Sequence, residues 1–349
     1  MRFAFLGVGA ALVLSTMGAT AAEPEVRGAG ASFPAKVYSR WGEAFARESG
    51  VRVSYAATGS GAGVREMAAR RIDFGASDSP LDVQKLSKDR LIQFPTMVGG
   101  LVPVVQLEIA GGQRLQLTGP VLAAIMQGEV RVWNDARIAD LNRGLVLPAL
   151  PIRRVVRADA SGSSESYTRY LGMVSAKFAA AVVPSLQPAW PGEVIRVEGS
   201  DGMSKAIRNT PGGIGYTSFD RVDMDQLRPV KLQNRAGNYV DASPAAFRAA
   251  VTASGFASAT DNEPSLLDQA GPQSWPITQA TYVLLDAQPP SATAARNTLR
   301  FFYGSFMKGD KLLDGTGFAP LPTTVQARVL QRFQQIRPQD GSDVLGVLR

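Results

Sequence analysis

Neither histidine nor cysteine occurs in the 349 residues of this chain. Without imidazole or thiol groups, the protein lacks the commonest general base, thiol nucleophiles, disulfides and the usual ligands of zinc and copper. An enzyme of this composition would have to use serine with lysine, or a pair of carboxylates. The composition therefore favours ligand binding over catalysis, and we expect no metal or other cofactor.

Long apolar runs are also missing after residue 22, so we expect no transmembrane helix. The first 22 residues have the pattern of a secretory signal peptide. Arg2 provides the positive start, residues 3–14 form a short apolar run, and residues 19–22 form a cleavage site of small side chains. Because no cysteine lies at the cut, anchoring through a lipidated cysteine is excluded. The sequence predicts a protein exported to the periplasm without stable membrane insertion.

Blocks of like charge are absent as well. The chain has 37 Lys and Arg residues against 30 Asp and Glu residues, a net charge of +7, and loss of Arg2 with the signal peptide leaves +7 − 1 = +6. This positive excess suits an anionic ligand. The basic residues are scattered and are not interleaved with aromatic ones, so the pattern argues against nucleic-acid binding.

The turn at residues 157–165 is the stretch around which the other motifs are arranged. It follows an apolar, strand-like run and precedes a helical one, so its backbone N–H groups lie at the positive end of a helix dipole and attract an anion. Arg157 adds a planar charged fork that matches two oxygens of a phosphate-like group, and Asp159 is placed to hold it. The alternative is an ordinary helix N-cap, Ser161 or Ser163, beside a surface ion pair.

Two further turns have the same character. In residues 28–34, two glycines precede a proline, and Ser32 and Phe33 are expected at a helix start with exposed N–H groups. Residues 57–63 join a strand to a helix with three glycines and two hydroxyls, one of them Ser60. This second turn is neither a nucleotide phosphate loop nor a dinucleotide fingerprint. Each turn alone is compatible with a plain N-cap, but their recurrence favours an anion site.

Asp78 follows a short predicted strand, residues 72–77, and precedes Pro80. A turn or cap residue is one interpretation. Among anion-binding donors, however, a carboxylate is useful when the ligand carries a proton for it to accept. Hydrogen phosphate carries such a proton at neutral pH and sulfate does not, so sulfate would face Asp78 with lone pairs only. Arsenate shares the proton and is left open by this argument.

Four motifs, in this order along the chain, together resemble the PstS family, the periplasmic phosphate-binding proteins of ABC phosphate importers. They are Gly28-Ala-Gly-Ala-Ser-Phe-Pro34, Gly59-Ser-Gly-Ala-Gly63, Asp73-Phe-Gly-Ala-Ser-Asp-Ser-Pro-Leu81 and Arg157-Ala-Asp-Ala-Ser-Gly-Ser163. The resemblance implies an α/β, two-lobed periplasmic binding protein fold of type II with two crossing strands as a hinge. It also implies a monomer that clasps inorganic phosphate between its lobes, with ABC transporter permease subunits as partners.

The resemblance assigns site residues one by one. It implies a shell of hydrogen-bond partners for phosphate: Ser32, Phe33, Ser60, Asp78, Arg157, Ser161, Gly162 and Ser163. Within this shell, Phe33 would donate through its backbone and Asp78 would accept the phosphate proton. Asp159 would orient the guanidinium of Arg157.

This sequence departs from the family pattern at several places. Ser32 and Ser163 stand where threonine is usual, and Gly61-Ala62 replaces a more usual Ser-Gly. Ala160 replaces a usual glycine, so a left-handed backbone there would cost about 1 kcal/mol or more. Glu165 stands where an apolar residue is common, which is expected to place negative charge near the site.

The remaining sequence predicts how the lobes are joined. An apolar run at residues 101–106 and a strand at 275–285 are expected to cross between the lobes, giving lobe 1 as 23–100 plus 280–349 and lobe 2 as 101–279. Ser200 is expected to cap a helix that runs through Ile207, and Trp133 is expected in the core rather than in a lectin-like stacking site.

Three alternatives to phosphate capture stay open at this point. The first is another protonated oxyanion such as arsenate. The second is a secreted phosphoester hydrolase, which the lack of histidine and cysteine disfavours. The third is an adhesion or signalling protein that keeps the fold and uses its outer surface.

Overall fold

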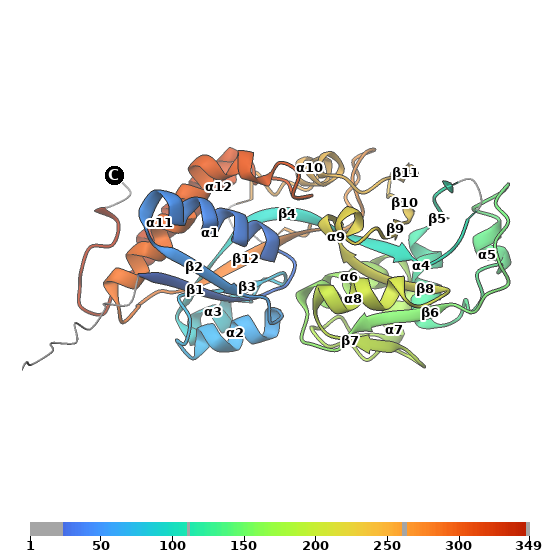
Figure 1. Ribbon diagram of the computed structural model, residues 1–349, viewed down its shortest axis with the longest axis horizontal. Coiled ribbons are helices and arrows are strands. Elements are labelled where there is room, and N and C mark those ends of the chain that lie inside the picture. Colours follow the sequence, from blue (N-terminus) through green and yellow to red (C-terminus); the bar gives the residue numbers. More distant parts are fainter. Residues whose placement is uncertain (1–23, 110–111, 260–263, 347–349) are drawn as a thin grey trace, which may run out of the picture.

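The computed structural model of the protein describes residues 24–109, 112–259 and 264–346. The predicted signal peptide, residues 1–22, lies outside the described residues. Two lobes lie side by side along the long axis and are joined near the middle by long strands (Figure 1). None of the helices in the described part of the chain would fit a lipid bilayer as a spanning segment.

Lobe 1 contains the chain start and the C-terminal helices. Its elements are β1 (Glu25–Gly30), α1 (Ala35–Ser49), β2 (Arg52–Ala56), α2 (Ser60–Ala68), β3 (Phe74–Ser77), α3 (Val83–Asp89), α11 (Ala292–Lys308) and α12 (Thr323–Arg332). Short 3-10 helices follow α11 and α12, at Gly309–Leu313 and Phe333–Gln335.

Lobe 2 contains the middle of the chain. Its elements are β5 (Gln116–Leu117), α4 (Gly119–Gln127), α5 (Ala136–Ala139), β6 (Arg153–Arg157), α6 (Gly162–Val174), α7 (Ala176–Ala181), β7 (Ile195–Val197), α8 (Gly199–Arg208), β8 (Gly213–Ser218), α9 (Phe219–Met224), β9 (Arg228–Pro229), β10 (Lys231–Gln233) and β11 (Tyr239–Val240). Helix α10 (Pro244–Ala253) packs against the crossing strand β4 (Leu91–Val105).

A single path of paired strands runs through both lobes, in the order β2-β1-β3-β12-β4-β8-β6-β7, with β9 also paired to β4. The strands are parallel within β2-β1-β3 and within β8-β6-β7, whereas β12 (Thr278–Asp286) and β4 are antiparallel to their neighbours. A separate small sheet has the order β11-β10-β5. The carboxyl ends of the parallel strands in the two lobes therefore define the edges where ligand-binding loops are expected.

Strand β4 belongs to both lobes. Its residues 91–100 pair with β12 of lobe 1, and its residues 101–105 pair with β8 of lobe 2. The sequence predicted the crossing only for residues 101–106; the strand begins ten residues earlier, and it is buried along its whole length. Gly99 and Gly100 lie at the change of partner, where a Cβ at Gly100 would lie 2.2 Å from the ring of Phe247.

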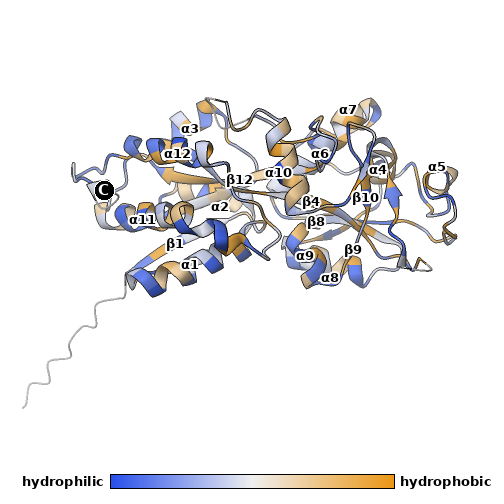
Figure 2. Cartoon of the chain, turned by 90° about the horizontal axis from the view of Figure 1, so that it is seen from above, coloured by the Kyte–Doolittle hydropathy of each residue, from blue (hydrophilic) through white to orange (hydrophobic). Residues whose placement is uncertain are grey.

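The core of each lobe lies between the sheet and its covering helices, and Figure 2 shows the apolar strands inside the more polar helices. In lobe 1, Tyr38, Phe74 and Phe302 pack edge to face. In lobe 2, Tyr167 stacks on Tyr216 at 4.3 Å between ring centroids. Fully buried aromatic side chains of this kind each stabilise a fold by roughly 1.5–3 kcal/mol.

Trp133 is fully buried and donates its indole N–H to Gly212 O at 3.0 Å. This contact confirms the prediction that Trp133 is a core residue. The prediction for Ser200 was wrong. Helix α8 has Glu198 as its N-cap, and Ser200 lies within the first turn.

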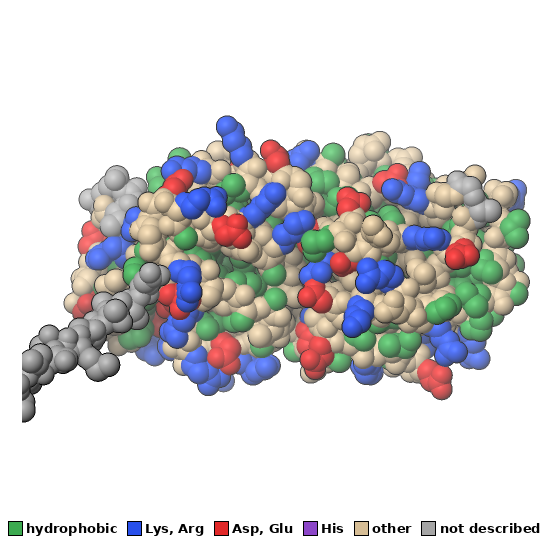
Figure 3. All heavy atoms as spheres, viewed as in Figure 1, with side chains coloured by type: hydrophobic (Ala, Val, Ile, Leu, Met, Phe, Trp, Pro, Cys, Tyr) green, Lys and Arg blue, Asp and Glu red, His purple; other side chains and the backbone are tan. Residues whose placement is uncertain are grey.

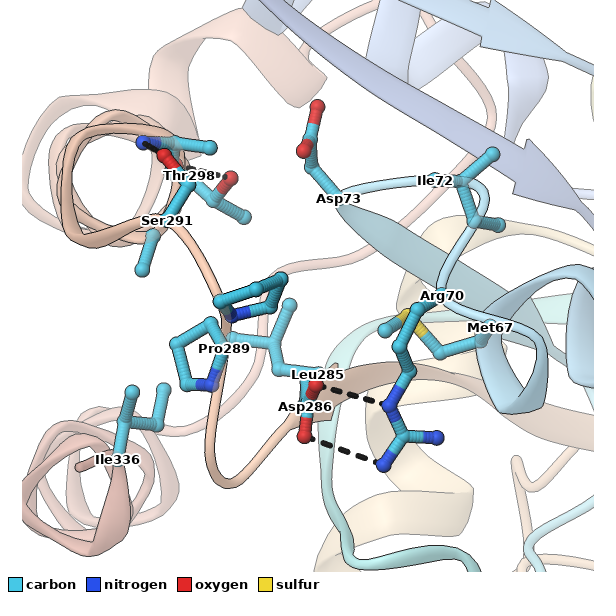
Figure 4. Close-up of a pocket in the computed structure, with 13 residues that line it drawn as sticks. Met67, Arg70, Ile72, Asp73, Leu285, Asp286, Pro289, Ser291, Thr298 and Ile336 are labelled. Carbon is cyan, nitrogen blue, oxygen red and sulfur yellow. Dashed lines mark hydrogen bonds and ion pairs between the residues drawn. The ribbon is translucent and has the colours of Figure 1, made fainter. Parts of the chain in front are cut away.

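Lobe 1 also encloses a small cavity between the end of α2, the end of β12 and the start of α11 (Figure 4). Its volume is about 80 Å³, and Arg70 lies in its wall. The Arg70 guanidinium binds Asp286 at 2.8 Å, so its charge is already balanced. The size and the balanced charge make this cavity a poor candidate for an anion site.

Candidate anion-binding site

The turns singled out by sequence converge where the two lobes meet. Lobe 1 contributes Ser32 and Phe33 from the β1–α1 turn, Ser60 from the start of α2, and Asp78 from the residue after β3. Lobe 2 contributes the end of β6 and the start of α6, with Arg157, Ser161, Gly162 and Ser163. These segments all lie at carboxyl ends of parallel strands and, for the most part, at helix N-termini, where backbone N–H groups favour anions.

Helices α2 and α6 both begin earlier than predicted. The sequence placed their starts at residues 64 and 166, and the structure has them at Ser60 and Gly162. The small residues that looked like loop residues therefore form the first helical turns. Ser161 is the N-cap of α6, and its Oγ accepts the N–H of Ser164 at 3.3 Å. Its hydroxyl proton is left to donate to a ligand.

Ser60 links the two lobes directly. Its Oγ accepts the backbone N–H of Asp78 at 3.2 Å and the backbone N–H of Gly162 at 3.1 Å. A hydroxyl that already accepts two hydrogen bonds directs its own proton toward a further acceptor. Ser60 is therefore a donor for an acceptor placed between the lobes.

Asp78 is the buried carboxylate of the site, with 4% of its surface exposed. One oxygen accepts the Thr281 hydroxyl at 2.7 Å and the other accepts the Ser163 hydroxyl at 3.2 Å. Burial raises the pKa of Asp78 to about 6, although both hydroxyls and the charge of Arg157 act to lower it. Asp78 is thus ionised at neutral pH and becomes protonated under mildly acidic conditions.

Thr281 was missed by the sequence reasoning. It lies in the middle of β12, a buried strand that also contains Thr278 and Gln279, so its hydroxyl gives no local sign of its role. The pairing of β12 with β4 shifts register beside it and leaves Thr96 without a partner across the strands, as in a β-bulge. Thr96 Oγ1 donates to Thr281 O at 3.2 Å, so the bulge fixes the residue that holds Asp78.

Arg157 supplies the positive charge of the site and is 4% exposed. Its Nε donates to Asp159 Oδ1 at 2.6 Å, and one Nη donates to the other carboxylate oxygen. Asp159 also accepts the N–H of Gly199 at 3.0 Å. Burial opposes ionisation of Asp159, but the bonds and charge of Arg157 and the Gly199 N–H together lower its pKa. The remaining guanidinium hydrogens of Arg157 are free to face an anion.

The β1–α1 turn places the side chains of Ser32 and Phe33 in different surroundings. The hydroxyl of Ser32 lies 2.8 Å from that of Ser200, a lobe 2 residue that sequence reasoning had assigned to a cap. Phe33 points its ring into the core, edge to face with Phe318 at 5.0 Å between centroids. Within the described residues, the backbone N–H groups of Ser32, Phe33 and Ser163 find no acceptor, so they are available to a ligand.

The structure shows how two of the unusual residues, Ala160 and Glu165, are placed. The described non-glycine residues with a left-handed backbone are Arg70, Arg90, Gln226 and Asp268, so Ala160 carries no such strain. Ala160 instead meets Gly61 across the lobes: Gly61 N–H donates to Ala160 O at 3.0 Å, and a Cβ at Gly61 would lie 2.5 Å from the Ala160 methyl group. Glu165 lines one cavity together with Asp78, so it does place negative charge near the site, and Arg169 pairs with it at 2.7 Å.

The donors and acceptors outline a site for a small oxyanion. The oxygens of such a ligand could accept hydrogen bonds from the N–H and O–H groups and from one guanidinium. A hydroxyl of the ligand could donate to the one carboxylate. Among the described residues, no three acidic side chains come together as a metal site would require. The arrangement therefore provides groups that can bind an anion.

Comparison with known proteins agrees with the fold and the motifs. The PBP superfamily domain matches residues 15–305, which makes the chain a two-lobed binding protein of type II. The phosphate-binding protein PstS of Pasteurella multocida is 35% identical over 95% of this chain and 96% of its own length. PstS of Xylella fastidiosa is 35% identical over 87% and 84%. The chain belongs to the PstS family of phosphate-binding proteins.

A solved structure shows the same fold at lower identity. The high-affinity periplasmic phosphate-binding protein PfluDING, determined with bound phosphate, has a TM-score of 0.67 and 22% identity. The alignment covers 87% of this chain and 92% of that one. The relatives and this solved structure are phosphate-binding proteins by name.

The buried ion pair leads to a stability prediction. Asp159→Asn should lower the free energy of unfolding by roughly 2–3 kcal/mol, because it leaves the Arg157 guanidinium buried without a counter-charge. Chemical denaturation of the ligand-free protein measures this change. The matched control is Glu66→Gln, which breaks an equally bidentate pair with Arg71 on the surface, at 2.7 Å for both bonds. The control should change stability little. Equal effects of the two substitutions would contradict the importance of burial.

Proposed function

We propose that this protein captures inorganic phosphate, as hydrogen phosphate, between its two lobes and delivers it to the permease subunits of an ABC importer. The observation that carries the proposal is the buried carboxylate of Asp78 among anion-seeking donors. A carboxylate repels an anion unless the anion brings a proton to the contact. Hydrogen phosphate brings one, and the relatives that match this chain over most of its length are phosphate-binding proteins.

The proposed contacts follow from the free donors. Arg157 offers its remaining guanidinium hydrogens to two phosphate oxygens. The hydroxyl protons of Ser60 and Ser161 and the free backbone N–H groups of Phe33 and Ser163 complete the shell around the other oxygens. Ser32 joins this set once the ligand replaces its present partner, Ser200, and Gly162 contributes by donating its N–H to Ser60 and so directing the Ser60 proton toward the ligand. The phosphate proton bonds to Asp78.

Closure of the two lobes is part of the proposal. We assign residues 23–100 and 280–349 to lobe 1 and residues 101–279 to lobe 2, joined by β4 and β12. A ligand with contacts in both lobes stabilises their closed arrangement relative to an open one. The direct bonds from Ser163 to Asp78 and from Gly61 to Ala160 fit this closed arrangement.

The location and the partner of the protein are also part of the proposal. We propose that residues 1–22 are removed as a signal peptide and that the mature protein acts in the periplasm as a monomer. The family membership supports a permease as the receiving partner. A role in adhesion or signalling, or in arsenate binding, is the competing proposal.

Calorimetric titration of phosphate-stripped mature protein tests the function. We expect tight one-to-one binding of phosphate and no binding of sulfate at neutral pH. Arsenate is titrated in parallel to establish how far the site distinguishes the two protonated oxyanions. Absence of phosphate binding would overturn the proposal in favour of a surface function.

Selection against sulfate should depend on the protonation of Asp78. At about pH 7.5 Asp78 is ionised and excludes sulfate; as the pH falls through about 6, Asp78 gains a proton that it can donate to sulfate. Sulfate affinity should therefore rise at least about tenfold between about pH 7.5 and about pH 5. Asp78→Asn, which always carries donor hydrogens, should bind sulfate at both pH values. Continued exclusion of sulfate by this variant would show that Asp78 does not distinguish phosphate from sulfate by accepting the phosphate proton.

Closure should depend on the empty space at Gly61. Gly61→Ala places a methyl group against Ala160 and should weaken phosphate binding roughly tenfold or more, since the lobes can no longer meet. Ala160→Gly in the same chain removes the facing methyl group and should restore most of the affinity. Titration gives the affinities, and small-angle scattering with saturating phosphate shows whether the lobes close. A double variant as weak as Gly61→Ala would refute the contact.

A further inference from the structure

A second basic cavity lies in lobe 2, apart from the site between the lobes. Its volume is about 960 Å³, and its lining residues come from the end of α4 and the starts of β6 and β7. Four arginine side chains line it: Arg131, Arg153, Arg154 and Arg196. Glu193 is the acidic residue in the lining. We call this cavity, with its four arginines, the arginine pocket.

The arginines of the pocket are not balanced by protein carboxylates. Within the described residues, none of the four forms an ion pair. Elsewhere on the surface, basic and acidic side chains are mixed, as the face in Figure 3 shows. Two basic residues that contact the adjoining loop, Arg137 and Lys177, are paired with Asp135 and Glu129. Other arginines on the surface also lack an ion pair, but the pocket gathers four of them around one cavity.

Arg154 forms the floor of the pocket and is 9% exposed. Its two Nη atoms donate to Met126 O and Glu193 O, each at 2.8 Å, so it also caps the carboxyl end of α4. Gly128 and Gly192 lie against the guanidinium, where a Cβ would approach Nη2 to 3.0 Å and 3.1 Å. These glycines leave no side chain over the charge. Burial, together with the charge of Arg131, lowers the pKa of Arg154.

The pocket is separate from the site between the lobes. Arg153 and Arg157 are the first and last residues of β6. At about 3.3 Å per residue, four steps of a strand separate their Cα atoms by roughly 13 Å. Arg153 lines the pocket and Arg157 faces the candidate phosphate site, so one strand carries positive charge to both ends of lobe 2.

We propose that the arginine pocket binds a soluble anion made of several linked phosphate groups. Guanidinium groups match pairs of phosphate oxygens, and the exposed arginines, Arg131, Arg153 and Arg196, surround a space far larger than one orthophosphate. A chain of phosphates meets several arginines at once, whereas a single phosphate meets one or two. This inference does not depend on the function of the other site.

The experiment uses mature protein saturated with orthophosphate, so that the site between the lobes is occupied. Sodium tripolyphosphate is titrated calorimetrically, and binding of one molecule per chain is expected. The triple variant Arg131→Gln, Arg153→Gln and Arg196→Gln should weaken it by about tenfold or more. Arg154 is left intact because it caps α4. The matched control substitutes the same number of exposed, unpaired arginines elsewhere: Arg47, Arg143 and Arg248.

The control variant should weaken binding less than about threefold, since it changes net charge without touching the pocket. The affinity should also fall with added salt, and less steeply in the pocket variant. Absence of tripolyphosphate binding overturns the proposal, as does an equal loss in the two variants. Binding to phosphatidylglycerol vesicles without binding of tripolyphosphate would overturn it too, because the pocket would then serve a lipid surface.

Discussion

A carboxylate buried between two lobes is the constraint on which the rest of the site depends. Asp78 has almost no contact with solvent, so its oxygens must be satisfied by protein groups or by a ligand. Lobe 1 provides the Thr281 hydroxyl and lobe 2 provides the Ser163 hydroxyl. Separating the lobes removes one of these donors. The carboxylate therefore couples the chemistry of the site to the arrangement of the lobes.

The positive charge of the site, unlike its carboxylate, is held by residues of one lobe only. Arg157 is fixed within its own lobe, by Asp159, which is itself fixed by the N–H of Gly199. The pair carries little net charge, so the proposed phosphate dianion would be met mainly by directed hydrogen bonds and helix N-termini. Such a site selects among oxyanions by their shape and by the number of protons they carry, because a neutral donor stabilises only an acceptor that it faces.

Much of this could be predicted from the sequence because the site is built from local motifs. Turns between a strand and a helix have a recognisable composition, and each of the residues named from them lies where the lobes meet. Thr281 and Ser200 could not be found in this way. Their roles arise from a register shift in β4 and from the packing of α8, which depend on contacts between distant segments. The left-handed backbone considered for Ala160 is absent, and the packing of its methyl group against Gly61 of the other lobe also depends on contacts between distant segments.

Gly99 and Gly100 in β4 leave room for two aromatic rings beside the point where the strand passes from one lobe to the other. A Cβ at Gly99 would lie 2.8 Å from the ring of Phe33, whose backbone N–H faces the candidate site, and one at Gly100 would lie 3.0 Å from the ring of Trp275. The indole N–H of Trp275 donates to Leu101 O at 2.9 Å. A rotation of one lobe about this point therefore changes the surroundings of an indole ring. Among the four tryptophans of the chain, Trp275 is therefore the one whose surroundings belong to the crossing strand itself.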